Sequence, residues 1–262
     1  IKFNFEKHKP NLNFKNNEIH ILFYSEKNIL LSDNFNSEKD LSQIDENTAA
    51  VLLETIQGGA GFILPVDDYL KKVKRRCEEM GALLVLDEIQ PGFGRTGKMF
   101  GFEHFGVAPD IVVMGKALGG GLPIGAFSAS KKLMGKLEDR PKLGHITTFG
   151  GNPVIATAAL TTINEILSTK LIKQIDQKEK IFRENLKHPL IKKISGKGLM
   201  LAPIFEQAEI PDFLVHHCIN KGLLLFWLLW EKNAIRISPP LNITEDEILR
   251  GCQIIRETLD EI

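Results

Sequence analysis

The sequence predicts an α/β fold, with a mainly parallel sheet in a larger domain and a smaller α+β domain after it. Three short apolar runs, at residues 49–53, 82–86 and 111–114, have the length and composition of buried strands. More than a dozen residues separate each run from the next, which is the length that a crossover between parallel strands needs. A helical pattern lies between the first two runs, and this order is typical of α/β proteins.

The first crossover is a predicted helix. Apolar residues recur there at spacings of four and three, which places them on one face of a helix. They are Val66, Leu70, Val73, Cys77 and Met80, and Gly81 is the predicted end of the helix. Residues 1–47 are rich in Asn, Lys and Asp and contain no complete strand-helix-strand unit.

The C-terminal half mixes predicted helices and strands. Helices are predicted at residues 154–167 and 170–186, and strands at 198–205 and 223–230. The last of these is the longest apolar run and suits a buried strand, although its two tryptophans could line a pocket. A final helix begins at Thr244, where Thr244 and Glu247 have the spacing of a capping box. We expect a domain boundary near residue 168, between a large domain (1–168) and a small one (169–262).

Composition describes an ordinary globular chain of 262 residues, of which 43% are hydrophobic and 25% charged, and this excludes disorder. The 33 basic residues balance the 33 acidic ones, so nothing in the net charge favours a nucleic acid or an acidic membrane as partner. A small neutral or zwitterionic ligand fits better. The opening residues lack the pattern of a signal peptide, and no uncharged apolar run has membrane-spanning length.

The three cysteines, Cys77, Cys218 and Cys252, are scattered, odd in number and without a CxxC pair. This pattern predicts neither a disulfide framework nor a zinc ribbon, and it favours a reducing, cytoplasmic setting. His216 and His217 precede Cys218 directly, but adjacent residues of a helix point to different faces. No metal site is therefore predicted.

Ionisable residues follow the three predicted parallel strands. Glu54 follows the first, Asp87 and Glu88 follow the second, and Lys116 follows the third. Open parallel sheets bind ligands at the carboxyl ends of their strands, so these groups are expected to face one crevice. Each residue also has a structural interpretation, as a helix cap or a solvated charge.

Two glycine-rich segments partly resemble nucleotide-binding motifs. Residues 92–98 have the spacing of a P-loop, but Met99 follows where the magnesium-binding Ser or Thr should stand. Residues 83–88 resemble the acidic strand of an NTPase, but they precede this segment, whereas in an NTPase the acidic strand follows the P-loop. Residues 119–121 are three glycines without a GxGxxG pattern. Both nucleotide-binding interpretations are therefore disfavoured.

Five motifs in order resemble the class III pyridoxal-phosphate aminotransferases, and their spacing is similar to that of the ornithine and acylornithine branch. They are Glu54-Thr-Ile-Gln-Gly, Leu86-Asp-Glu-Ile-Gln, Gly115-Lys-Ala-Leu-Gly-Gly-Gly, Thr147-Thr-Phe-Gly-Gly-Asn-Pro and Ile235-Arg-Ile-Ser-Pro-Pro-Leu. The resemblance runs from about residue 30 to the C-terminus. It implies a fold-type-I transferase that uses pyridoxal 5'-phosphate as its cofactor.

The resemblance implies roles for five residues in binding the cofactor. Lys116 would form a Schiff base with pyridoxal phosphate and then move a proton as general base and acid. Asp87 would pair with the pyridine nitrogen, Gln90 with the phenolic oxygen, and Ile89 would press on one ring face. Glu54 would lie behind them, near the same edge of the ring.

The same resemblance implies that the site is shared between two subunits. Thr148 would bind the cofactor phosphate of the neighbouring subunit, so a homodimer would complete each site. Arg236 would grip a substrate carboxylate, for which a planar guanidinium is suited. The implied reaction moves an amino group from an amino acid or an ornithine-like ω-amino donor to a 2-oxo acid in two half-reactions, and 2-oxoglutarate is the expected acceptor.

The chain departs from the family pattern in two ways. Gly59 stands where the ornithine and 4-aminobutyrate branches usually carry a glutamate that shields the carboxylate-binding arginine, which leaves an α-amino donor open as well. Residues 1–47 contain neither the phosphate-cradling Gly-Ser/Thr loop nor the ring-stacking aromatic residue of the family, so an N-terminal portion is expected to be missing. The alternatives are an aminomutase on the same scaffold and a catalytically silent, dimerising fragment.

Overall fold

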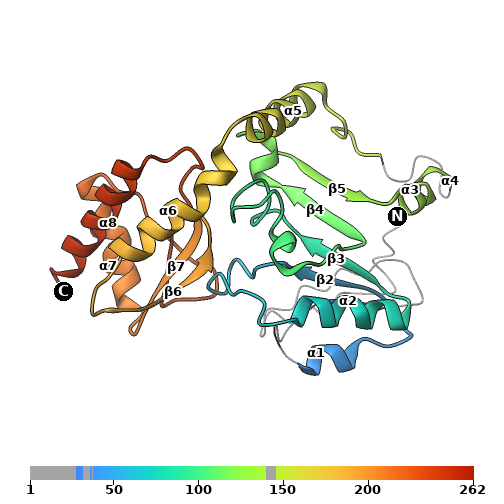
Figure 1. Cartoon of the computed structure of the whole chain (residues 1–262), viewed down its shortest axis with the longest axis horizontal. Coiled ribbons are helices and arrows are strands. Elements are labelled where there is room, and N and C mark those ends of the chain that lie inside the picture. The colour runs from blue at the N-terminus through green and yellow to red at the C-terminus, as the bar shows by residue number, and fades with distance from the viewer. Residues whose placement is uncertain (1–27, 32–35, 37, 140–145) are drawn as a thin grey trace. The chain divides into compact units, whose positions relative to one another are not determined.

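The computed structural model describes residues 28–31, 36, 38–139 and 146–262, and the chain divides into two compact units (Figure 1). Unit 1 comprises residues 1–55, 65–89 and 102–162, and unit 2 comprises residues 56–64, 90–101 and 163–262. Most of residues 1–47, where no motif could be placed, lie outside the described part. The predicted domain division between residues 168 and 169 stays a prediction.

A five-stranded sheet forms the centre of unit 1. Its strands follow in chain order, from β1 (Asn28–Leu31) through β2 (Thr48–Glu54), β3 (Leu83–Asp87) and β4 (Ile111–Gly115) to β5 (Gly125–Ala129). The first four strands are parallel, and β5 runs antiparallel to β4. The three predicted parallel strands are therefore confirmed, and the sheet adds β1 and β5, whose short or small-residue sequences did not predict strands.

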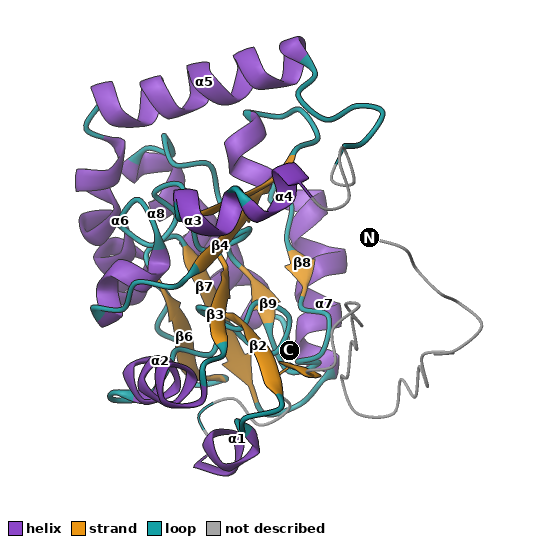
Figure 2. Ribbon diagram, turned by 90° about the vertical axis from the view of Figure 1, so that its right-hand side faces the viewer, coloured by secondary structure: helices purple, strands orange, loops and turns teal. Residues whose placement is uncertain are grey.

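Helix α2 (Tyr69–Met80) makes the crossover between β2 and β3 (Figures 1 and 2). Leu70, Val73 and Cys77 are buried in the same apolar cluster as the side chains of both strands. Gly81 ends the helix with a φ of 70°, a left-handed conformation that glycine takes without strain. Val66, however, precedes the helix and is 53% exposed, so its predicted place on the helical face is wrong. The φ of 41° at Asp67 explains the later start, because this conformation cannot continue a right-handed helix.

Five short helices and the start of one longer helix complete unit 1. The short helices are α1 (Glu38–Gln43), η2 (Gly101–Phe105), η3 (Lys116–Gly119), α3 (Lys131–Met134) and α4 (Lys136–Asp139). Helix α5 (Pro153–Ser168) begins in unit 1 and continues into unit 2 at residue 163. The helix predicted at residues 154–167 is thereby confirmed.

Unit 2 is a small α+β assembly with its own core. Its elements are α6 (Leu171–Asn185), β6 (Ile191–Lys197), β7 (Met200–Phe205), α7 (Glu209–Cys218), η4 (Ile219–Lys221), β8 (Phe226–Trp227), β9 (Ile235–Arg236) and α8 (Glu245–Leu259). Strands β6 and β7 form one antiparallel pair and β8 and β9 another, and bridges such as Leu201 to Ile237 join them. Buried side chains of the three helices and these strands form one apolar cluster.

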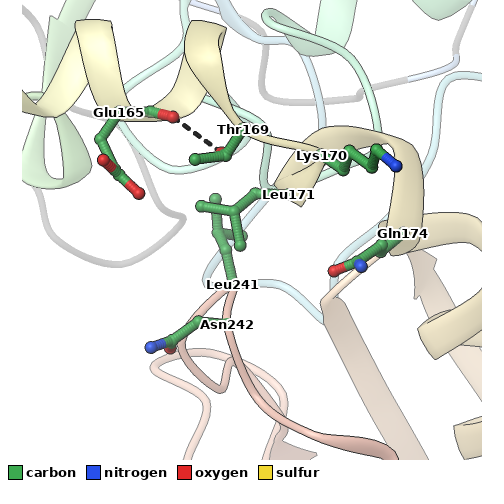
Figure 3. Close-up of a pocket in the computed structure, with 7 residues that line it drawn as sticks. All are labelled: Glu165, Thr169, Lys170, Leu171, Gln174, Leu241 and Asn242. Atoms are coloured by element: carbon green, nitrogen blue, oxygen red, sulfur yellow. Dashed lines mark hydrogen bonds between the residues drawn. The ribbon is translucent and has the colours of Figure 1, made fainter.

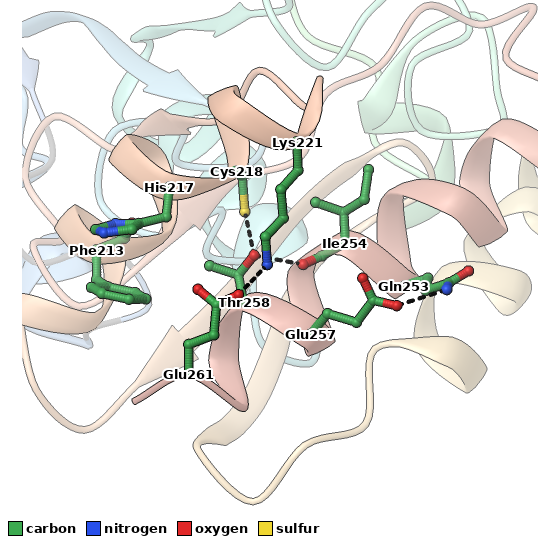
Figure 4. Close-up of polar contacts among 9 residues, drawn as sticks. All are labelled: Phe213, His217, Cys218, Lys221, Gln253, Ile254, Glu257, Thr258 and Glu261. Carbon is green, nitrogen blue, oxygen red and sulfur yellow. Dashed lines mark hydrogen bonds and ion pairs between the residues drawn. The ribbon is translucent and has the colours of Figure 1, made fainter.

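Polar contacts fix the ends of the helices in unit 2. The Cys218 thiol of α7 donates to the Thr258 hydroxyl of α8 at 3.5 Å, and Lys221 pairs with Glu261 (Figure 4). At the start of α8, the Glu247 N–H donates to the Thr244 hydroxyl at 3.2 Å and the Thr244 N–H to the Glu247 carboxylate at 2.8 Å. The predicted capping box is confirmed.

The apolar run at residues 223–230 is not the buried strand that was predicted. Only Phe226 and Trp227 are in a strand, and Leu225 and Leu228 are the buried members of the run. Four others are exposed, namely Leu224, Phe226, Leu229 and Trp230. The strand has only two residues, so the rest of the run lies in loops, where burial does not alternate between two faces.

Candidate functional site

The ionisable residues predicted at the strand ends lie at one edge of the unit 1 sheet. Glu54 ends β2 and pairs in register with Asp87, which ends β3. Asp87 pairs in turn with Val113 of β4, and Lys116 follows the last residue of that strand. The parallel register therefore places these three residues at the carboxyl ends of neighbouring strands, as predicted.

Asp87 is a half-buried carboxylate with one occupied oxygen. Its Oδ1 accepts the backbone N–H of Ile89 at 2.8 Å, and among the described residues no hydrogen bond reaches Oδ2. Burial raises the pKa of Asp87, while the Ile89 hydrogen bond and the positive charge of Lys116 act in the opposite direction. The free oxygen can accept a proton or a hydrogen bond from a cationic ligand.

Lys116 has an exposed side chain on a constrained backbone. Its φ is 43°, a left-handed value that is uncommon for a residue with a side chain and that marks functional sites more often than others. The preceding Gly115 is buried, and a Cβ there would lie 3.1 Å from the Ile124 carbonyl oxygen and 3.5 Å from the Ile89 side chain. The close packing around Gly115 thus holds the backbone that presents the lysine.

Glu88 was also predicted to face the crevice at the strand ends, and this prediction is wrong because its side chain is fully buried. Its Oε1 accepts the Thr55 hydroxyl at 2.6 Å and the Phe102 N–H at 2.9 Å. The alternation of β3 could have indicated this, because Leu84 and Leu86 are buried on the same face two and four residues earlier. Glu88 ties the segments after β2 and β3 to η2.

The other predicted cofactor residues of unit 1 are Ile89 and Thr148, which have fewer contacts with Asp87 and Lys116. Ile89 is half-buried and packs near Gly115. Thr148 is exposed in a turn that the Gly150 N–H to Thr147 carbonyl hydrogen bond closes at 3.2 Å. Among the described residues no hydrogen bond joins Thr148 to Asp87 or Lys116, so the structure does not bring Thr148 to them within one chain.

Gln90 begins a segment of unit 2 that a half-buried arginine, Arg95, holds in place through hydrogen bonds. Arg95 donates to the carbonyls of Leu199 and Pro239, and burial lowers its pKa to about 10. The Leu199 N–H donates back to the Arg95 carbonyl at 2.9 Å. Sequence reasoning missed Arg95, because nothing local distinguishes it from a surface arginine. Its contacts fix residues 90–101 next to the loop that follows β9.

Arg236, the predicted carboxylate-binding residue, lies on β9 in unit 2. It pairs in register with Phe226 of β8, and its guanidinium carbon lies 5.9 Å from the centre of the Phe226 ring. Its Nε is buried and has no hydrogen-bond partner among the described residues. A buried donor without a partner is costly, so a ligand oxygen here would be stabilised.

The adjacent residues His216, His217 and Cys218 have separate neighbours. The His217 ring stacks on Phe213 at 3.8 Å, the His216 ring meets Trp227 edge-on at 5.7 Å, and Cys218 bonds Thr258. Over residues 28–31, 36, 38–139 and 146–262, no cluster of His, Cys, Asp or Glu side chains is arranged to hold a metal ion.

A cavity of about 420 Å³ lies elsewhere in unit 2, between the end of α5, the start of α6 and the loop before α8 (Figure 3). Its lining residues are Glu165, Thr169, Lys170, Leu171, Gln174, Leu241 and Asn242. None of them is a predicted site residue. No helix within the described part of the chain combines the length and the apolar character needed to cross a bilayer.

Comparison with known sequences gives one consistent result. The family described as aminotransferase class-III matches residues 2–259. The acetylornithine aminotransferase of Caldanaerobacter subterraneus subsp. tengcongensis is 40% identical over 225 residues, which are 84% of this chain and 55% of that protein. The putrescine aminotransferase of Pectobacterium atrosepticum is 40% identical over 224 residues, which are 83% of this chain and 48% of that protein. The chain spans about half the length of these curated relatives.

Solved structures agree. The ornithine aminotransferase of Plasmodium yoelii superposes with a TM-score of 0.82 and 30% identity, over 91% of this chain and 66% of that one. The N-acetylornithine aminotransferase of Stenotrophomonas maltophilia superposes with a TM-score of 0.78 and 30% identity, over 90% of this chain and 66% of that one. The predicted fold class, a fold-type-I pyridoxal-phosphate-dependent transferase, is confirmed by these similarities.

Proposed function

The chain belongs to the class III aminotransferase family, whose members depend on pyridoxal phosphate, and we propose that it moves an amino group from an amino donor to a 2-oxo acid. The proposed donor is an amino acid or an ornithine-like ω-amino compound, and the proposed acceptor is 2-oxoglutarate. The observation that carries the proposal is the placement of Asp87 and Lys116 at one edge of the sheet. When bound there, pyridoxal phosphate supplies an electron sink for the bond that breaks at the donor carbon.

Lys116 is the proposed attachment and proton-transfer residue. Its exposed amine would hold the cofactor covalently. The Lys116 Nζ would also take the proton that leaves the donor carbon and give it back once the amino group has moved. The constrained backbone at Gly115 and Lys116 supports this role, because it limits where the side chain can point.

Asp87 is the proposed partner of the pyridine nitrogen. Its Oδ1 is oriented by the Ile89 N–H, and its Oδ2 has no hydrogen bond among the described residues, so the side chain fits a ligand that brings one N–H donor. A half-buried carboxylate stabilises a cationic ring strongly. The positive ring would lower the pKa of Asp87 and keep the pair ionised.

Three further residues complete the proposed ring site. Ile89 is half-buried next to Gly115 and offers an apolar face. Gln90 would donate to the phenolic oxygen, and the segment that it begins is held by the Arg95 contacts. Glu54 pairs in register with Asp87 and would act as a second carboxylate behind it.

Arg236 is the proposed binding residue for the carboxylate of donor and acceptor. Its unpartnered Nε supports this role, since a carboxylate oxygen would satisfy the buried donor. Gly59 has no side chain that could pair with the guanidinium. Arg236 would therefore be available to a carboxylate in both half-reactions.

We propose a homodimer with shared sites. Thr148 is exposed. Large apolar side chains are also exposed near it in the sequence, on β5 and on α5. They are Phe127, Ile146, Phe149, Val154 and Leu160. Exposed apolar side chains in this number mark a surface that a partner covers, and a second copy is the partner that would bring Thr148 to a cofactor phosphate. Three free, buried cysteines support a reducing, cytoplasmic setting.

The experiment that tests the function supplies the purified chain with pyridoxal phosphate, 2-oxoglutarate and a panel of amino donors. Release of a keto acid or aldehyde together with glutamate supports the aminotransferase. A rearranged amino acid without keto acid release would indicate an aminomutase. A folded dimer that yields no product and retains no cofactor would leave the silent fragment as the better account.

A further inference from the structure

Thr55 holds the end of β3 through two hydrogen bonds. It follows the last residue of β2, and its backbone N–H donates to the Asp87 carbonyl at 3.4 Å. Its hydroxyl donates to the Glu88 carboxylate at 2.6 Å, and both of these residues are fully buried. Because water does not reach either group, loss of this bond would leave a buried hydroxyl without its acceptor, which is costly. The contact between Thr55 and Glu88 is therefore a fixed part of this edge of the sheet.

The backbone of Glu88 joins two peptide groups that contact Asp87 or belong to it. The first, between Asp87 and Glu88, is held on both sides, because its carbonyl accepts the Thr55 N–H and its N–H donates to the Val113 carbonyl at 2.9 Å. The second carries the Ile89 N–H, which donates to the Asp87 Oδ1 at 2.8 Å. Peptide groups are planar, so only the φ and ψ of Glu88 orient the second group relative to the first. These two angles decide where the Ile89 N–H meets the Asp87 carboxylate.

The Glu88 side chain is anchored at its far end. Its Oε1 accepts the Thr55 hydroxyl and also the Phe102 N–H of η2, the latter at 2.9 Å. The rotamers open to a side chain depend on the φ and ψ of its own residue, so an anchored carboxylate restricts both angles. The contacts of Glu88 thereby limit the direction of the Ile89 N–H.

We propose that Thr55 and Glu88 are positioning residues for Asp87, whose carboxylate they orient through the Ile89 N–H toward a cationic aromatic ring nitrogen. Neither residue touches the ligand. The proposal rests on the proposed function, because it deepens the role given there to Asp87. The Ile89 hydrogen bond lowers the pKa of Asp87 against the larger effect of burial, so a displaced N–H has a consequence that can be measured without the cofactor.

Nuclear magnetic resonance of the full, cofactor-free chain tests the positioning. The Ile89 amide proton should shift as Asp87 titrates, because the two groups are hydrogen-bonded. Thr55→Val removes the hydroxyl that holds Glu88, so this coupled shift should be largely lost and the pKa of Asp87 should rise. Thr55→Ser and Glu88→Gln keep a donor and an acceptor, and both should retain the coupled shift. Thr55→Cys, whose thiol is a weaker donor, should lose part of it and replaces the valine variant if that one does not fold.

Thr48→Val is the matched control. Thr48 is buried at the opposite end of β2, and its hydroxyl donates to the Asp45 carboxylate at 3.1 Å. Its loss should lower stability in urea and leave the signals of Ile89 and Asp87 unchanged. Thr55→Val should also weaken pyridoxal phosphate binding by about 2- to 10-fold, the loss expected for one hydrogen bond, whereas Thr48→Val should not.

Two results would overturn the proposal. One is an unchanged coupled shift in Thr55→Val and Thr55→Cys, and the other is an equal loss of that shift in Thr48→Val. A coupled shift that depends on Thr55 in a chain that binds no pyridoxal phosphate would support the positioning of Asp87 and overturn only the proposed function.

Discussion

Asp87 and Lys116 stand at the carboxyl ends of two hydrogen-bonded parallel strands, and the charge of Lys116 partly offsets the effect of burial on the pKa of Asp87. Burial is the larger effect, so the pKa of Asp87 lies above its ordinary value in the cofactor-free chain. The site therefore holds a carboxylate that is poorly stabilised until a second cation arrives. A protonated pyridine nitrogen is such a cation.

Asp87→Asn should stabilise the cofactor-free chain at neutral pH. A carboxyl whose pKa is raised on folding contributes stability below its ordinary pKa of 3.8, and this stability is lost as the pH rises through the higher folded value. The neutral amide avoids that loss, so the midpoint of thermal unfolding should exceed that of the unaltered chain at pH 7. The difference should shrink as the pH falls toward 4.

The same variant should bind the cofactor less well. Removal of a charge-assisted hydrogen bond costs about 1.5–3 kcal/mol, or roughly 10- to 100-fold in affinity for pyridoxal phosphate. Asp68→Asn is the control, because Asp68 is exposed, pairs with Lys71 and has a lowered pKa. It should not stabilise the chain at neutral pH. A lower midpoint for Asp87→Asn than for the unaltered chain would contradict the assigned direction of the pKa.

Glu88→Leu should destabilise unit 1 by about 2–5 kcal/mol, because it removes the buried acceptor of two hydrogen bonds. Their donors are the Thr55 hydroxyl and the Phe102 N–H. Glu88→Gln keeps an oxygen for both and should cost less than about 1.5 kcal/mol. Urea unfolding followed by circular dichroism measures both changes. Equal losses in the two variants would show that the acceptor oxygen is not what stabilises this region.

Shared active sites predict complementation between two inactive variants. Lys116→Ala lacks the amine and Thr148→Trp blocks the proposed phosphate contact, so each homodimer should be inactive. Mixed refolding would give hybrid dimers in which one site has both residues intact, and random pairing should restore about a quarter of the activity. Sedimentation of Phe149→Asp, which puts a charge on the exposed apolar surface, provides an independent measure of dimerisation. Inactive mixtures of variants that do dimerise would argue against sites shared through Thr148.

The parallel strands and the helix ends could be predicted because their signals are local. The runs that became β2, β3 and β4 are apolar over a strand's length, and the capping box at Thr244 and Glu247 is a fixed spacing. The run at residues 223–230 misled for the opposite reason. Its apolar residues resemble a buried strand, but only Phe226 and Trp227 form one, and Leu229 and Trp230 lie exposed in the loop that follows.

The site could be predicted only in part. Glu54, Asp87 and Lys116 each follow a predicted strand, and a parallel sheet brings such residues to one edge whatever lies elsewhere. Glu88 and Arg95 act through contacts with residues far along the chain, as the Arg95 to Leu199 hydrogen bond shows. The hydrogen bond from the Trp230 N–H to the Gly59 carbonyl likewise joins residues 171 positions apart, which no local pattern reports.

The central claim is that Lys116 is the amine that carries pyridoxal phosphate. Incubation of the purified chain with the cofactor, reduction with borohydride and peptide mass spectrometry test it most directly, because reduction makes the link permanent. We predict one added pyridoxyl-phosphate mass, found on the peptide that contains Lys116 and absent from Lys116→Arg. Lys98, an exposed lysine in a glycine-rich loop, serves as an internal control and should stay unmodified. Modification of other lysines alone, or none at all in a folded chain, would contradict the account.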